Sequence, residues 1–172
     1  MANQGTPAGR AAHLSIHPNA YRDTTPWQYT TDAGGTASDS FNIGSGFGNG
    51  KYDLTMAGPN RFLRRFRGDA TQAGKSAEVS TRYATEPGTG KTALYFKMAN
   101  SSAAPAKFTI TSNQYRGDGP WTYTVAAGGS AEDYFNAVAY QNGWYDFTIT
   151  VDASWSRRFT GHIETGTASV SG

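Results

Sequence analysis

The chain has 172 residues, of which 13% are aromatic, 16% are charged and 21 are glycine, and its formal net charge is +2 at pH 7. This composition is too aromatic for a disordered chain and suits short strands joined by tight turns, while the charge is too small to indicate a nucleic-acid partner. The absence of cysteine excludes disulfides and thiolate metal sites, and no run of about 18 apolar residues is present that would span a membrane.

One unit is written twice along the chain. PWQYTTDAGGTASDSF at residues 26–41 returns 94 positions later as PWTYTVAAGGSAEDYF at residues 120–135. NGKYDLTMAGPNRFLRRFRG at residues 49–68 returns 93 positions later as NGWYDFTITVDASWSRRFTG at residues 142–161. Upstream, MANQGTPAGRAAHLSI at residues 1–16 matches MANSSAAPAKFTI at residues 98–110 once three extra residues are allowed in the first. Ordered matches of this kind indicate a repeated structural unit, and we call the two units the first and the second copy.

The first copy reads as strands separated by turn signals at Gly34-Gly35, Asn49-Gly50 and Gly58-Pro59-Asn60. It is shorter than the second copy, because the candidate strands AEVSTRY and TALYFKM, which come before Met98, have no counterpart ahead of Met1. We therefore expect the first copy to lack its N-terminal strands and the chain to be a piece of a longer polypeptide. A natural protein that starts with an incomplete copy is the alternative.

The basic segment NRFLRRFRGD at residues 60–69 reads as a strand in which aromatic and charged side chains alternate. A period of two places Phe62, Arg64 and Phe66 on one face and Leu63, Arg65 and Arg67 on the other. We expect Asp53 to pair with Arg65 across a hairpin, and Asp146 to pair with Arg158 in the second copy. We expect these to be structural ion pairs with exposed arginines, each worth about 0.2–1 kcal/mol.

Two further arginines exceed what the repeated ion pair needs. The second copy has Ser154 in place of Arg61 and Thr160 in place of Arg67. We therefore predict that Arg61 and Arg67 contact an anionic surface.

The small, polar stretch at residues 69–77 is predicted to be a linker, and seven strands are predicted after it, with turns every eight to twelve residues. No segment carries a convincing helical stripe. We predict an all-β fold of two tandem antiparallel β-sandwich repeats of immunoglobulin-like size. Residues 1–68 form the first, truncated at its N-terminus, and residues 78–172 the second. One larger sandwich that shares strands between the copies is the alternative.

Several motifs resemble sites without fulfilling their requirements. TEPGTGKT at residues 85–92 approaches a phosphate-binding loop, but a strand pattern follows it instead of a helix, which indicates a hairpin turn. His13 and His17 lie about 13 Å apart on a strand, too far for one ion, and His162 has no counterpart in the first copy. No nucleophile–base set is present. The sequence therefore predicts no catalytic site, no metal site and no cofactor.

The tryptophans divide into two groups. Trp27 and Trp121 recur between the copies and Trp155 replaces Phe62, which indicates packing in the core or at its edge. Trp144 lies on the polar face of its strand, and the first copy has lysine there. With neighbouring Tyr140, it is a candidate to insert at a membrane interface or to stack on a sugar or a choline group. A partly covered surface aromatic is the alternative.

GKYDLTMAGPNRFLRRFRGD and GWYDFTITVDASWSRRFTGHIETGTASVSG resemble the tandem C-terminal domains of bacterial phosphocholine-preferring phospholipases C. The resemblance covers nearly the whole chain. One departure is Arg61, where the family string G-P-N-G-F has glycine. The resemblance implies a longer exported enzyme whose catalytic domain lies outside this chain, so no catalytic residue carries over.

The leading hypothesis is a secreted, non-catalytic accessory region of a phospholipase C, which assists engagement of a phosphocholine-lipid surface or stabilises the catalytic domain. Its expected partners are that catalytic domain and the lipid surface, with no nucleic acid. A carbohydrate-binding module and a purely structural spacer are the alternatives, and fold class alone does not separate them.

Overall fold

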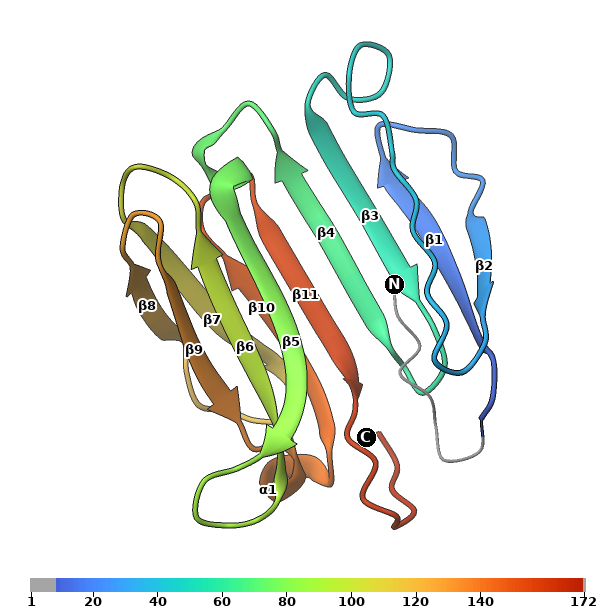
Figure 1. Cartoon of the computed structure of the whole chain (residues 1–172), viewed down its shortest axis with the longest axis vertical. Helices are drawn as coiled ribbons and strands as arrows, with labels where there is room; N and C mark the ends of the chain where they lie inside the picture. The colour runs from blue at the N-terminus through green and yellow to red at the C-terminus, as the bar shows by residue number, and fades with distance from the viewer. Residues whose placement is uncertain (1–8, 172) are drawn as a thin grey trace.

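The computed structural model of the protein describes residues 9–171, and its regular structure is almost entirely strand (Figure 1). The elements are β1 Ala12–Ala20, β2 Trp27–Thr31, β3 Lys51–Ala57, β4 Leu63–Asp69, the 3-10 helix η1 Ala73–Ser76, β5 Ala77–Thr85, β6 Thr92–Asn100, β7 Ala106–Gln114, β8 Trp121–Val125, β9 Ser130–Phe135, α1 Ala137–Gln141, β10 Trp144–Thr150 and β11 Ser156–His162. An eight-stranded sheet has the order β2-β1-β3-β4-β11-β10-β7-β8, and a three-stranded sheet has the order β5-β6-β9. The predicted all-β class and antiparallel two-sheet arrangement are confirmed.

The two copies share the larger sheet. The first copy contributes β1 to β4, the second contributes β7, β8, β10 and β11, and the corresponding strands β4 and β11 join them as an antiparallel pair. In this pair Arg65 lies opposite its own counterpart, Arg158, so the copies meet about an approximate twofold axis. One sheet thus contains strands of both copies, which is the strand sharing of the alternative that we considered. The predicted linker holds the end of β4 and η1, and the division at residues 69–77 stays a prediction.

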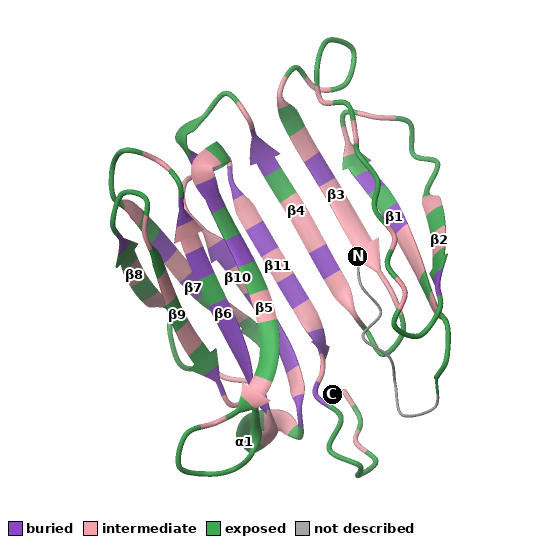
Figure 2. Cartoon of the chain, viewed as in Figure 1, coloured by how far each residue is buried: buried purple, intermediate pink, exposed green. Residues whose placement is uncertain are grey.

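The hydrophobic core lies between the smaller sheet and the second-copy half of the larger sheet (Figure 2). Phe96 of β6 is 0% exposed, and its ring centroid lies 5.5 Å from that of Phe147 and 5.3 Å from that of Phe159. Trp155, 1% exposed, belongs to the same core. We call the face of the larger sheet that looks toward the smaller sheet its inner face, and the opposite one its outer face.

The first-copy half of the larger sheet has no such covering sheet. In Figure 1 the smaller sheet lies in front of the second-copy strands, while the segment that joins β2 to β3 runs across β1 and β3. Within that segment Phe41 packs against Trp27 at 4.8 Å between ring centroids, as Phe135 of β9 packs against Trp121 at 4.8 Å. The segment therefore takes part of the role of β9, and β5 and β6 have no counterpart among residues 9–171.

The local turns follow the sequence pattern with one difference. The segment with partial likeness to a phosphate loop connects β5 to β6 as a hairpin, in which the Glu86 N–H donates to Lys91 O over 2.7 Å. Asn142 and Gly143 have φ of 49° and 100°, the left-handed region that favours these residues. In the structure, however, Asn142 caps the end of a short helix, α1, that we had not expected. This helix begins at Asn136, whose side chain accepts a hydrogen bond from Ala139 N–H.

Candidate functional site

Two ion pairs lie side by side on the outer face where the copies meet. Arg65 donates from Nε to Asp53 Oδ1 over 2.8 Å and from Nη2 to Oδ2 over 2.6 Å. In the second copy, Arg158 donates to Asp146 over 2.9 Å and 2.6 Å. Both are bidentate, the geometry that strengthens guanidinium–carboxylate pairs.

The carboxylates of these pairs are more deeply buried than we expected. Asp53 is 7% and Asp146 3% exposed, whereas the side chains of Arg65 and Arg158 are 42% and 41% exposed. Neighbouring strands complete the burial, because Asn19 donates to Asp53 Oδ1 over 2.8 Å and Asn113 donates to Asp146 Oδ1 over 2.8 Å. This burial leads us to expect a larger contribution to stability than the sequence alone indicated, since removal of either carboxylate leaves a buried network incomplete.

The electrostatics of the two ion pairs follow from this arrangement. Burial raises the pKa of Asp53, but the hydrogen bonds from Arg65 and Asn19 outweigh it and hold the pKa below its usual value. The hydrogen bond to Asp146 raises the pKa of Arg158, and the neighbouring charge of Arg65 opposes that rise. The two pairs form a row in which each positive charge has its own buried carboxylate.

One hollow of about 300 Å³, which we call the Trp144 hollow, is lined by residues of both copies. Arg61 enters it from the turn before β4, where its φ is 56°. The Arg61 guanidinium donates to Tyr115 Oη over 3.3 Å, and its carbonyl oxygen accepts from Thr160 Oγ1 over 2.6 Å. Arg158 lines the same hollow. Aromatic surface and two guanidinium groups therefore line the same hollow.

Trp144 itself is partly buried. Its ring lies 4.4 Å from the His162 ring at an angle of 33°, and its indole N–H donates to Ser169 Oγ over 3.1 Å. The C-terminal segment after β11 thus fixes the orientation of the indole. This is the partly covered arrangement that we considered as the alternative to a fully exposed tryptophan.

The first copy has a corresponding hollow of about 320 Å³, the Lys51 hollow. Lys51 replaces Trp144, Arg67 replaces Thr160, and Ser154 stands in the place of Arg61. Tyr21, with φ of 69°, corresponds to Tyr115, with φ of 75°. The two hollows therefore share a backbone frame, but one contains the indole of Trp144, whereas the other has Lys51 at that position beside Arg67 and Asp69.

The structure brings together only part of the predicted contact set. Trp144 and Arg61 line one hollow, and Arg67 lines the other. Tyr140 lies on α1, with the Arg116 guanidinium 4.0 Å from its ring and its hydroxyl 3.4 Å from Asp118 Oδ2. Sequence reasoning missed Tyr115, although its recurrence as Tyr21 in the repeated YR string was a usable signal.

The histidines are engaged elsewhere. His13 Nδ1 lies 3.0 Å from Thr30 Oγ1, and His17 Nε2 lies 2.9 Å from Ser15 Oγ. Within residues 9–171, no group of three or more His, Cys, Asp or Glu side chains is placed to hold a metal ion. In that same part of the chain, none of the helices has the length and apolar character needed to cross a membrane.

Comparison with known proteins gives one family. The family model for the bacterial phospholipase C C-terminal domain matches residues 1–69 and 76–162. The non-hemolytic phospholipase C of Burkholderia pseudomallei is 34% identical over 149 residues, which are 85% of this chain and 20% of that protein. The non-hemolytic and hemolytic phospholipases C of Pseudomonas aeruginosa are 33% and 32% identical over 87% and 72% of this chain, or 21% and 17% of their own lengths. The chain spans about a fifth of the curated relatives it matches.

Proposed function

Because this chain belongs to the bacterial phospholipase C C-terminal domain family, we propose that it is a non-catalytic accessory region of such an enzyme and helps it to engage a phosphocholine-lipid surface. In this proposal the enzyme is exported, its catalytic domain is joined to this chain, and the chemistry belongs to that domain. The share of the relatives that lies outside the match, about four fifths of their length, leaves room for a catalytic domain.

The observation that carries the lipid role is the Trp144 hollow. A phosphocholine head group has a phosphate and a quaternary ammonium. The guanidinium of Arg61 and the hydroxyl of Tyr115, 3.3 Å apart, offer donors to a phosphate. The indole of Trp144 in the same hollow offers an aromatic face to the ammonium. Donors for the phosphate and an aromatic ring for the ammonium therefore line one hollow.

The Lys51 hollow adds a second, electrostatic contribution. Lys51 and Arg67 line it together with Asp69, so two cations face one carboxylate, and a surface with excess positive charge is attracted to anionic lipid within a Debye length. We therefore assign salt-insensitive contact to Trp144 and salt-sensitive contact to Arg61 and Arg67.

Vesicle sedimentation at low and high salt tests this assignment, with phosphatidylcholine vesicles that either contain or lack an anionic lipid. Trp144→Ala should weaken binding about fivefold at both salt concentrations, the factor that ~1 kcal/mol of cation–π contact gives. The double variant Arg61→Ser and Arg67→Thr, which copies the second copy, should weaken binding mainly at low salt. Arg82→Ser is the matched control, because Arg82 is an exposed arginine of the smaller sheet. Tyr140→Ala reports whether the contact extends to α1.

Three results would contradict the proposal. Failure of the intact chain to bind any vesicle at low salt removes the lipid role. Glycan binding without vesicle binding favours a carbohydrate-binding module instead. Turnover of a chromogenic phosphocholine ester that stays with the purified chain contradicts the non-catalytic assignment.

A further inference from the structure

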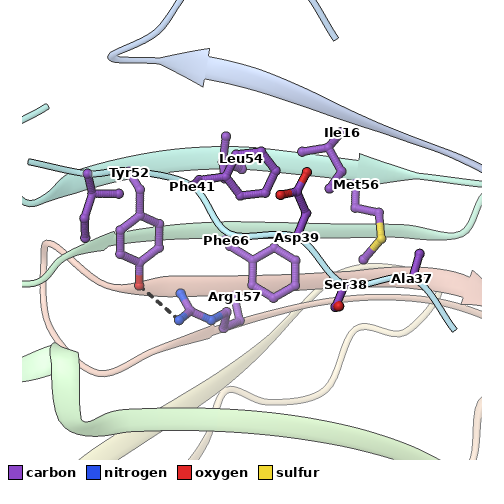
Figure 3. A pocket seen from close by; sticks show the side chains of 11 residues that line it. Ile16, Ala37, Ser38, Asp39, Phe41, Tyr52, Leu54, Met56, Phe66 and Arg157 are labelled. Carbon is purple, nitrogen blue, oxygen red and sulfur yellow. Dashed lines mark hydrogen bonds between the residues drawn. The ribbon is translucent and has the colours of Figure 1, made fainter. Parts of the chain in front are cut away.

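The inner face of the first-copy half of the larger sheet carries an open apolar groove of about 440 Å³ (Figure 3). Its floor consists of side chains from β1, β3 and β4, and one edge is formed by the segment that joins β2 to β3. The apolar side chains of the floor are Ile16, Leu54, Met56 and Phe66. A solvent-facing apolar groove of this kind marks an interaction site more often than a random surface does.

The second copy shows what covers the corresponding face. The repeat relates Ile16 to Ile110, Leu54 to Phe147, Met56 to Ile149 and Phe66 to Phe159. The four second-copy residues are 0%, 1%, 0% and 3% exposed. In the first copy Ile16 is also buried, at 7% exposed, whereas Leu54, Met56 and Phe66 are only partly buried. Strand β6 makes this difference, because its alternate residues Leu94, Phe96 and Met98 are all 0% exposed in the core of the second copy.

A polar contact at the end of the groove also resembles one that the smaller sheet covers on the second-copy side. On the second-copy side of the sheet, Nη2 of Arg64, a first-copy residue on β4, donates to Tyr145 Oη over 3.2 Å, and the hydroxyl of Tyr83 on β5 lies 2.7 Å from the same oxygen. On the first-copy side, Nη2 of Arg157, a second-copy residue on β11, donates to Tyr52 Oη over 3.0 Å, as the dashed line in Figure 3 shows. Arg157 corresponds to Arg64 and Tyr52 to Tyr145. The groove thus ends in an arginine–tyrosine pair of the same kind, formed between the two copies, to which a hydroxyl like that of Tyr83 can add a hydrogen bond.

We propose that this groove is the docking site for a β-hairpin of the β5–β6 type, supplied by polypeptide that precedes β1 in a longer protein. The inner strand of this hairpin carries large apolar side chains at alternate positions, as β6 does. It enters from the N-terminal side of β1, because β6 leads directly into β7, the counterpart of β1. The relatives are about five times as long as the matched region, so additional polypeptide is present in them. This proposal goes beyond the lipid role and does not depend on it.

The repeat allows a direct test, in which the first copy has three extra residues between Asn3 and β1. Met1-Ala2-Asn3 has the same sequence as Met98-Ala99-Asn100. A duplicate of residues 76–97 placed immediately ahead of Met1 therefore recreates the sequence of the complete hairpin. Hydrogen exchange read by mass spectrometry then compares β3 and β4 with β10 and β11, whose face is already covered.

In the extended chain, exchange in β3 and β4 should slow by roughly tenfold, because a covered face opens less often, while β10 and β11 should not change. Binding of a dye that reports exposed apolar surface should fall. The matched control is the same extension with Leu94→Asp and Phe96→Asp in the duplicate only, which should leave β3 and β4 at their original rates.

A second arm guards against a misfolded extension. A synthetic peptide of residues 76–100, added to the unextended chain, should protect the same two strands, and the peptide with both aspartates should not. Unchanged exchange in β3 and β4 with a bound or fused hairpin would overturn the proposal. So would a dimer of the unextended chain, measured by light scattering, in which β3 and β4 are already as protected as β10 and β11. That result would mean that the groove is covered by another molecule of the same protein.

Discussion

The two halves of the larger sheet have corresponding strands but different coverings. On the outer face they are alike, since each has a bidentate aspartate–arginine pair with a closest approach of 2.6 Å. On the inner face they differ, since Phe159 is 3% exposed under the smaller sheet while its counterpart Phe66 is only partly buried. Strand pairing and the outer network therefore form without the second layer. The second layer determines how much apolar surface each half removes from water.

The largest expected effect comes from breaking the covered half. Phe159→Ala should lower the free energy of unfolding by about 3–5 kcal/mol, because it leaves a cavity in a closed core. Phe66→Ala, the matched change in the open half, should cost only about 1–2 kcal/mol, because a partly exposed ring loses less burial. Denaturant unfolding of both variants measures the difference. Equal losses of stability would show that the groove is filled in solution, for instance by another molecule of the same protein.

The outer face gives the next largest effect and should treat the two halves alike. Asp53→Ala and Asp146→Ala should each lower the free energy of unfolding by about 2 kcal/mol, less than for a fully buried pair because the arginines are partly solvated. Equilibrium unfolding at neutral pH measures both. A loss in one copy more than twice that in the other would mean that the second layer also supports the outer network.

The pH dependence of stability distinguishes charge from packing at Asp53. Its pKa in the folded protein lies below the usual value, so the unfolded chain binds a proton more readily. The stabilisation is complete above the unfolded pKa of about 3.9 and is lost as pH falls through the lowered folded pKa. Asp53→Asn keeps the shape of the side chain and should be less stable than the unmodified protein at neutral pH. That gap should close below about pH 4. A constant gap would indicate a packing effect.

Much of the fold could be predicted because its information is local. Alternation along residues 63–67 assigned the two faces of β4, and the repeat placed Asp146 and Arg158 by analogy with Asp53 and Arg65. The family resemblance was carried by strings of the same segments, and the family match confirms it for the C-terminal domain of bacterial phospholipases C.

The remaining features depend on residues far apart in sequence. The pairing of β4 with β11 joins strands about ninety residues apart, and the alternation of either strand does not name its neighbour. The burial of Asp53 comes from Asn19 on another strand. The contact of Trp144 with Ser169 comes from a segment without strand pattern. A hairpin pattern in the sequence predicts contacts only between adjacent strands, so these contacts could not be predicted from it.

The smallest expected effect concerns the position at which the copies differ most on the outer face. Trp144→Lys gives the second copy the residue of the first, and it removes the ring contact with His162 and the hydrogen bond to Ser169. We expect a loss of about 1 kcal/mol, the scale of one stacked pair or one hydrogen bond, and a melting temperature only a few degrees lower. Lys51→Trp, the reciprocal change, should be nearly neutral, because position 51 is exposed. Thermal unfolding of both single variants separates the two positions. If Trp144→Lys prevents folding, the indole is part of the core, and its place in the Trp144 hollow cannot support a role in lipid contact. If the loss of stability is small and vesicle binding falls, Trp144 contributes to the surface contact and little to the stability of the fold.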